Sequence, residues 1–194
     1  GVARQLEKAC DAVVNSGLAR LEFGAFRAAV AGLLEGLTKN PGAAFLLHEL
    51  GPGTYEARHA ANVCMTSLLL GVKLESYLIR ERRRLPATRA KEVTNLGAGA
   101  MLADLGMLML PREVRDRFLA SGDESDVEFQ KHVRLGFDAV KEWADPSVAS
   151  VVLNHHQRYD GSGFPARKTI SGELPPPAGS EIHIFHRIVA AADP

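Results

Sequence analysis

The sequence predicts an all-α helical bundle with a helical lead-in at its N-terminal side. Three observations predict this: apolar residues recur at spacings of three and four, strand-like alternation is nearly absent, and helix caps flank the periodic stretches. The 194 residues are 46% hydrophobic, which is enough for a core and excludes intrinsic disorder. Lys plus Arg (23) balance Asp plus Glu (23), which excludes a broad surface for nucleic-acid polymers.

The lead-in covers residues 1–50. The amphipathic stretches Val2–Val14 and Leu18–Leu37 each predict a helix there. The run Asn40-Pro41-Gly42 ends the second of them. The same amphipathic pattern suits a homodimerising segment and the remnant of a sensor domain equally well.

The core domain covers residues 51–194. Its first helix is predicted to begin at Thr54, whose hydroxyl can cap it. A later helix is predicted over Val127–Val140, because Ser125 and Glu128 form a capping-box signature before an apolar repeat.

Glycines and prolines interrupt the chain from Tyr159 to Ser180, which predicts a long irregular loop. Loops of this length inside a compact domain usually carry function. This loop directly follows two adjacent histidines, His155 and His156. The sequence therefore points to a site near the start of the loop.

The cysteines, the apolar stretches and a basic run indicate the expected location of the protein and its contacts with membranes and solvent. Cys10 and Cys64 lie among apolar residues, and their spacing indicates neither a disulfide framework nor a structural zinc site. Such cysteines are typical of a reducing compartment, so a cytoplasmic location is expected. The longest apolar stretches are shorter than the about 20 residues that cross a bilayer, so no membrane segment is expected here. The basic run from Arg80 to Lys91 is predicted to be a solvated helix face or a linker between helices.

Asp104 is the most conspicuous single residue, because apolar residues flank it on both sides. A carboxylate in such surroundings must be paired, hydrogen-bonded or bound to metal. A role as a helix cap, an ion pair with an arginine and metal binding explain the presence of Asp104 among apolar residues equally well.

Several imidazoles and carboxylates on separate predicted helices are candidates for a shared site. Taken singly, each histidine is more simply explained as a packing or surface residue. Helical bundles nevertheless build two-metal sites from inward side chains of facing helices. The candidate ligands are His59, Asp104, His132, His155, His156 and Asp193.

The stretch from His155 to Pro165, HHQRYDGSGFP, closely resembles the HHExxDGxGYP motif of HD-GYP proteins, with Gln157 and Phe164 replacing glutamate and tyrosine. Shorter matches occur in the family's order over residues 54–194. They are Arg58-His59, Ala103-Asp104-Leu105-Gly106 at the His-Asp-x-Gly-Lys motif, His132 with Gly136, and Arg187–Asp193, which resembles RIIAVAD.

The resemblance implies a helical domain of the HD superfamily that hydrolyses cyclic di-GMP with two or three iron or manganese ions. It implies that His59, Asp104, His132, His155, His156 and Asp193 bind metal, with Asp104 bridging two ions at the catalytic centre. A hydroxide between the ions would attack phosphorus while the ions stabilise the developing charge.

The resemblance also implies nucleotide contacts from the loop. The residues concerned are Arg158, Gly161, Gly163, Phe164 and Pro165. Arg158 is expected to neutralise phosphate, and the glycines are expected to let the backbone approach the nucleotide. Because the family's last helix continues past the position of Asp193, the domain is expected to extend beyond Pro194.

Two positions depart from the family's pattern. Ala103 stands where the family has its eponymous histidine, and Met107 stands where it has a lysine. Losing a ligand is expected to cost at least about 10- to 100-fold in metal affinity or activity. His186 and the nearby His183 lie too far before Asp193 along a helix to compensate, and both are expected to pack or face solvent.

Three functions follow as alternatives. The sequence favours a degenerate HD-GYP domain of cyclic di-GMP signalling, which binds the nucleotide, a divalent metal or a signalling protein partner with weak or absent hydrolysis. The first alternative is an active metal-dependent cyclic di-GMP phosphodiesterase. The second is a metal-free interaction domain.

Overall fold

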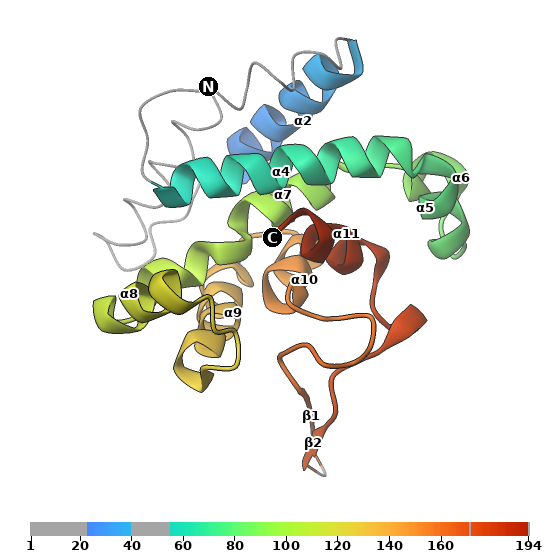
Figure 1. Cartoon of the computed structure of the whole chain (residues 1–194). Coiled ribbons are helices and arrows are strands. Elements are labelled where there is room, and N and C mark those ends of the chain that lie inside the picture. Colours follow the sequence, from blue (N-terminus) through green and yellow to red (C-terminus); the bar gives the residue numbers. More distant parts are fainter. Residues whose placement is uncertain (1–22, 40–54, 171, 194) are drawn as a thin grey trace.

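The computed structural model describes residues 23–39, 55–170 and 172–193, and it shows a bundle of helices with one small hairpin (Figure 1). The helices are α2 (Phe23–Lys39), α4 (Tyr55–Lys73), α5 (Glu75–Glu81), α6 (Ala87–Ala90), α7 (Thr94–Leu102), α8 (Arg112–Ser121), α9 (Val127–Val140), α10 (Pro146–Asn154) and α11 (Ile184–Ala192). Short 3-10 helices are η1 (Ala103–Met109) and η2 (Gly179–Glu181), and the strands are β1 (Arg167–Thr169) and β2 (Gly172–Leu174). The predicted all-α class is confirmed.

Helices α2, α4 and α7 pack together in the core, with α4 running lengthwise across the molecule (Figure 1). A Cβ atom on Gly97 of α7 would lie 2.7 Å from Leu68 of α4 and 2.9 Å from Val30 of α2. Glycine at this position therefore lets three helices meet. The described part of the lead-in thus belongs to the hydrophobic core, while the boundary near residue 50 stays a prediction. The expected helix Val2–Val14 and the expected cap Thr54 lie outside the described residues.

The segment η1 carries Asp104 and packs tightly against α9. A Cβ atom on Gly106 would lie 1.9 Å from the carbonyl oxygen of His132 and 2.6 Å from the backbone nitrogen of Gly136. Only glycine permits so close a backbone approach. This contact holds Asp104 next to His132.

Helix α9 spans the predicted residues, but its cap differs from the expected one. Asp126 is the N-cap, and its carboxylate accepts a hydrogen bond from the backbone N–H of Glu128 at 2.9 Å. The hydroxyl of Ser125 instead donates to Asp123 at 2.6 Å. The expected capping box was wrong, because Asp126 directly precedes the first helical residue and its negative charge also favours the helix dipole.

The predicted irregular loop from Tyr159 to Ser180 contains a short antiparallel hairpin that the sequence pattern did not predict. Strand β1 pairs with β2 in a register that sets Arg167 opposite Leu174. The hairpin projects away from the helices (Figure 1), so no burial pattern marks its strands in the sequence.

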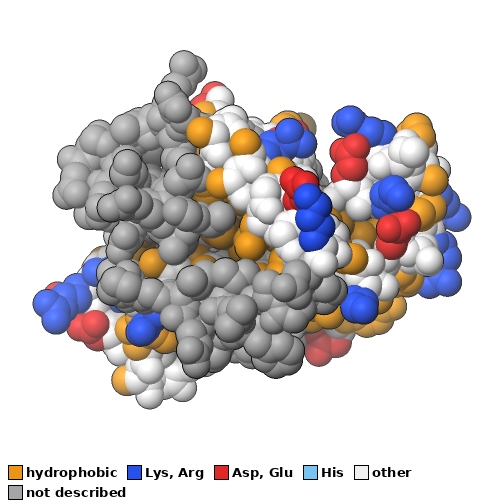
Figure 2. Space-filling view, turned by 90° about the horizontal axis from the view of Figure 1, so that it is seen from above, with side chains coloured by type: hydrophobic (Ala, Val, Ile, Leu, Met, Phe, Trp, Pro, Cys, Tyr) orange, Lys and Arg blue, Asp and Glu red, His pale blue; other side chains and the backbone are white. Residues whose placement is uncertain are grey.

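The basic run from Arg80 to Lys91 lies on α5, α6 and their connection, and Figure 2 shows Lys and Arg side chains gathered at this end of the molecule. Arg82 is not part of the solvated face. Its guanidinium donates to the carbonyl oxygen of Ala90 at 2.7 Å and lies 4.5 Å from the ring centre of Phe185. Among the described residues, no helix has the length and apolar character to cross a membrane.

Candidate metal centre

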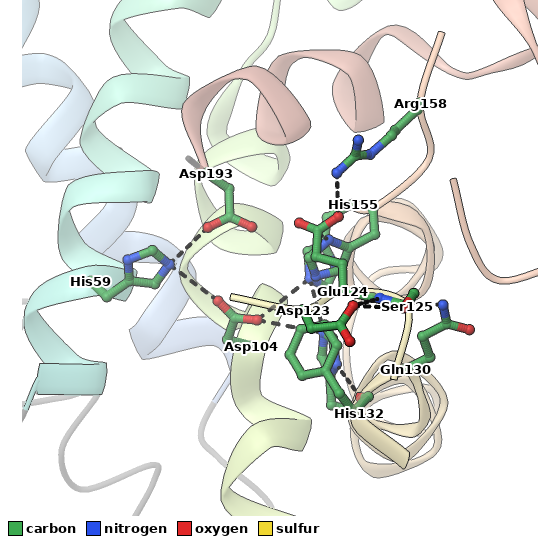
Figure 3. A network of polar contacts seen from close by, with 12 residues as sticks. His59, Asp104, Asp123, Glu124, Ser125, Gln130, His132, His155, Arg158 and Asp193 are labelled. Carbon is green, nitrogen blue, oxygen red and sulfur yellow. Dashed lines mark hydrogen bonds and ion pairs between the residues drawn. The ribbon is translucent and has the colours of Figure 1, made fainter. Parts of the chain in front are cut away.

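Five elements bring the candidate ligands to one place (Figure 3). His59 comes from α4, Asp104 from η1 and His132 from α9, while His155 and His156 directly follow α10 and Asp193 directly follows α11. They form two groups whose potential ligand atoms lie within 4.8 Å of one another, and Asp104 belongs to both groups. The structure thus brings together all six residues that the sequence singled out.

The carboxylate of Asp104 lies between these two groups. Its Oδ2 faces Nε2 of His59 at 3.3 Å. Its Oδ1 faces Nε2 of His132 at 3.6 Å and Nε2 of His155 at 3.5 Å. Each group is thus faced by one oxygen of the Asp104 carboxylate. A carboxylate that bridges two cations has the same arrangement.

His132 and His155 are oriented by the backbone. Nδ1 of His132 donates to the carbonyl oxygen of Phe129 at 2.8 Å, and Nδ1 of His155 donates to that of Val152 at 2.9 Å. Because a carbonyl can only accept, each Nδ1 carries a proton, and the neutral ring then has a lone pair on Nε2. The two Nε2 atoms lie 3.4 Å apart. With Oδ1 of Asp104, three electron-rich atoms face one another.

Such a cluster fits a metal ion. Ligand atoms that surround a divalent metal at about 2.1 Å lie about 3.0 to 3.4 Å from one another. The three separations here, 3.4 to 3.6 Å, are close to that range. A hydrogen bond from the second ring nitrogen to a backbone carbonyl is also the usual support of a metal-binding histidine. Imidazole and carboxylate ligands suit iron, manganese and zinc.

The second group consists of His59, Asp104 and Asp193. Nε2 of His59 lies 2.8 Å from Oδ1 of Asp193, whose side chain is 10% exposed. The carboxylates of Asp104 and Asp193 raise the pKa of His59 to about 10. Without a metal, this imidazole is therefore protonated at neutral pH, and the proton lies where a metal ion could bind.

Burial and the central carboxylate set the protonation of the first group. Burial, followed by the charge of His155, lowers the pKa of His132 to about 4 and that of His156 well below its usual value. Burial also opposes protonation of His155, but Asp104 outweighs it and raises that pKa. Burial would raise the pKa of Asp104, but hydrogen bonds with His155 and His59 outweigh it and lower that pKa. Neutral His132 and His156 and an ionised Asp104 are the forms that bind metal.

The loop after α10 holds His156 in place. Its ring stacks on Phe164, with the ring centres 4.5 Å apart. A Cβ atom on Gly163 would lie 2.3 Å from the carbonyl oxygen of His156, so glycine allows the loop to fold back on the histidine. Nδ1 of His156 faces Oε1 of Glu124 at 3.6 Å, and its Nε2 is buried with no hydrogen-bond partner among the described residues. The loop therefore supports a candidate ligand.

A cavity of about 140 Å³ opens beside the site, and its lining includes His59, Asp104, Met107, Arg115, Glu124 and His156. The lining does not include the loop residues expected to contact a nucleotide, namely Arg158, Gly161, Gly163, Phe164 and Pro165. Gly163 and Phe164 are buried, the backbone carbonyl of Pro165 accepts from Gln157 at 2.8 Å, and Arg158 forms an ion pair with Glu124. Their contact with a nucleotide stays a prediction.

Comparison with known proteins identifies the family. Residues 74–194, more than half of the chain, match the HD domain family. The chain belongs to this family. The sequence is also 33% identical over 110 residues to the cyclic di-GMP phosphodiesterase response regulator RpfG of Xanthomonas campestris pv. campestris (strain 8004). The match covers 53% of this chain and 26% of that protein, so it spans about a quarter of the relative's length. No solved structure gives a significant match.

In this HD domain, the two departures from the expected pattern have different surroundings. Ala103 is 1% exposed in the hydrophobic core and offers no ligand atom. Met107 lines the cavity, so an apolar side chain faces the space where the resemblance implies a lysine. His186 is buried beside Ser150, with Nε2 to Oγ at 3.1 Å, whereas His183 is exposed and caps α11.

Two charged residues that line the cavity of this HD domain, Arg115 and Glu124, were not among the site residues predicted from the sequence. Glu124 forms an ion pair with Arg158 (Figure 3) and lies 3.6 Å from Nδ1 of His156, although both residues are more than thirty positions further along the chain. No local pattern signals this contact, because it depends on how α9 packs against α10.

Proposed function

We propose that this HD domain is a degenerate HD-GYP module of cyclic di-GMP signalling. It binds one or two divalent metal ions and the nucleotide, and hydrolyses the nucleotide weakly or not at all. The supporting observation is a converging set of metal-binding atoms beside a cavity in which Met107 takes the place of a lysine. The relative RpfG is a cyclic di-GMP phosphodiesterase, which supports cyclic di-GMP as the ligand.

The residues of the site have distinct roles in this proposal. His59 and Asp193 would hold one ion, while His132, His155 and His156 would hold the other, and Asp104 would be shared by both groups. Bound iron or manganese would polarise a phosphodiester and lower the pKa of water. Met107 contributes no charge to the phosphate, and Ala103 leaves one ligand position without a side-chain donor. The domain would act in the cytoplasm, through a signalling protein partner or a second copy of the chain.

An active phosphodiesterase is the second candidate. It is favoured by the position of Asp104, whose two oxygens face the two groups separately. In that case the remaining ligands would be sufficient for catalysis without a histidine at position 103.

Metal content and turnover distinguish the two candidates. The protein is purified without chelators, its metals are measured by mass spectrometry, and binding and turnover of cyclic di-GMP are measured after addition of Mn²⁺ or Fe²⁺. We expect bound metal, nucleotide binding and turnover far below the roughly 1 to 10³ per second of ordinary enzymes. Asp104→Asn is expected to lose the metal, while Asp116→Asn, on the exposed face of α8, keeps it. Turnover in the ordinary range contradicts the degenerate function, and absence of both metal and nucleotide binding leaves the metal-free interaction domain.

The double substitution Ala103→His and Met107→Lys extends this experiment by restoring the two missing groups. Metal occupancy or turnover is expected to rise by about 10-fold or more, since one ligand typically contributes that much. Met109→Lys is the control, because Met109 is exposed and lies outside the cavity lining. If the double variant behaves like the control, the other ligands do not form a site that a histidine and a lysine can complete.

A further inference from the structure

The cavity contains an arginine although position 107 has no positive charge. Arg115 of α8 lines the cavity together with Met107 and His156. Its Nε atom is buried and has no hydrogen-bond partner in the described parts of the chain. A buried N–H without an acceptor is costly and rare. A ligand that offers an acceptor here would remove that cost.

The neighbouring arginines of α8 already have carboxylate partners. Nε of Arg112 lies 3.3 Å from Asp116, and Nε of Arg117 lies 2.8 Å from Asp126. Arg115 forms no ion pair with any residue that the structure describes. The arginine of α8 that faces the cavity is thus available for an anion.

The other charges of the cavity are mostly negative. Its carboxylates are Glu56, Asp104, Glu124 and Asp193. Glu124 is paired with Arg158, and Asp104 and Asp193 belong to the candidate metal groups. Two divalent ions would offset the carboxylates, and Arg115 would then leave the cavity with a positive excess that attracts an anion.

The shape and lining of the cavity favour a nucleotide over a small inorganic anion. One water needs about 10 to 15 Å³ of such space, so the about 140 Å³ here accommodates a much larger group. Met107, Phe118, Leu119 and Phe129 supply an apolar lining in the same cavity as Arg115. Apolar and aromatic side chains suit a nucleobase, and a guanidinium suits a phosphate.

We propose that Arg115 is the phosphate-binding residue of this cavity, in the role that the resemblance assigns to a lysine at position 107. Its planar guanidinium can donate two parallel hydrogen bonds to one phosphate, which a lysine cannot do. The identity of the nucleotide rests on the proposed function, but the phosphate site itself does not.

Calorimetry on the manganese-loaded full chain tests this role with two probes, inorganic phosphate and cyclic di-GMP. Arg115→Gln is expected to weaken the binding of both by about 10- to 100-fold, because charge-assisted hydrogen bonds are lost. The control Arg112→Gln removes an exposed arginine from the same helix and is expected to change neither affinity. Manganese content and the midpoint of thermal unfolding are expected to match the wild type in both variants. Adding Met107→Lys to Arg115→Gln is expected to recover part of the phosphate binding.

The outcomes separate this proposal from the proposed function. Equal affinities of wild type and Arg115→Gln for inorganic phosphate, or no phosphate binding by the wild type, overturn the role of Arg115. If phosphate binding depends on Arg115 but cyclic di-GMP does not bind, the phosphate-binding role of Arg115 is supported and the proposed nucleotide is contradicted. If Arg115→Gln does not fold, Arg115→Lys is measured in its place. Weaker phosphate binding by Arg115→Lys than by the wild type supports the role of Arg115, and unchanged binding overturns it.

Discussion

At the scale of single residues, protons and metal ions compete for the same atoms. Nε2 of His59 is protonated between two carboxylates when no metal is bound, and its pKa is raised to about 10. Asp104 outweighs burial and raises the pKa of His155 as well, whereas burial lowers the pKa of His132 to about 4. An ion that binds here must displace the protons, so metal binding at this site is coupled to proton release.

His186 lies outside the candidate site and is predicted to make the fold sensitive to acid. Burial, followed by the charges of His183 and His155, lowers its pKa to about 3. The pKa of a histidine in the unfolded chain is about 6.5. Between these pH values the unfolded chain binds the proton and the folded chain does not. The free energy of unfolding therefore falls as the pH drops from 6.5, by at most about 1.4 kcal/mol per pH unit from this residue.

The substitution His186→Gln tests this effect. Glutamine does not titrate and can still form a hydrogen bond with Ser150, the partner of His186 in the fold. Urea unfolding between pH 7 and 4.5 is expected to show a shallower loss of stability in the variant than in the wild type. Equal slopes would contradict the assignment of the acid sensitivity to His186.

At the scale of elements, the contact of η1 with α9 positions the central carboxylate. Gly106→Ala would set a methyl group 1.9 Å from the carbonyl oxygen of His132, and the backbone of one element would have to shift. We expect a loss of about 3 kcal/mol or more in the free energy of unfolding, together with loss of metal binding. Urea denaturation and metal analysis measure the two effects.

Gly36→Ala is the matched control for this prediction. Gly36 lies inside α2, and a Cβ atom there would have no neighbour within 4 Å. Alanine is the better helix former, so this variant is expected to gain up to about 1 kcal/mol. Wild-type stability and metal content in Gly106→Ala would show that the close approach does not position the site.

Local sequence patterns predicted some elements correctly and failed for others. The spacing of apolar residues predicted α9 at Val127–Val140, because burial of one helix face leaves a regular trace in the sequence. The cap of α9 was misassigned to Ser125, since Asp126 competes for the same backbone N–H groups. The β1–β2 hairpin was missed because β2 is exposed along its whole length and has no apolar alternation.

At the scale of the whole molecule, the candidate centre connects elements that are far apart in the chain. His59 and Asp193, which share a hydrogen bond, are 134 residues apart. Metal ions bound to the two groups, whose residues come from α4, η1, α9, α10 and α11, would therefore favour the folded state over the unfolded one. Ion binding at 100 times its dissociation constant adds about 2.7 kcal/mol to the stability.

Thermal unfolding with and without Mn²⁺ measures this stabilisation. The wild type is expected to unfold at a higher temperature with Mn²⁺ and to lose the gain on addition of a chelator. Asp104→Asn is expected to show little gain, because it weakens both ligand groups, whereas Asp116→Asn is expected to behave like the wild type. An unchanged midpoint in the wild type would count against a native metal site.

Local sequence patterns were sufficient to predict the all-α class, the family and the six candidate ligands. These follow from helical periodicity, from the motif around His155 and His156, and from shorter motifs that resemble the same family, all of which are local properties of the chain. Only the tertiary structure showed that Gly106 lets η1 approach His132, that Gly163 supports a histidine, and that Arg115 faces the cavity. The physical reason is that these contacts depend on the packing of elements distant in sequence, and local patterns report only which face of each element is buried.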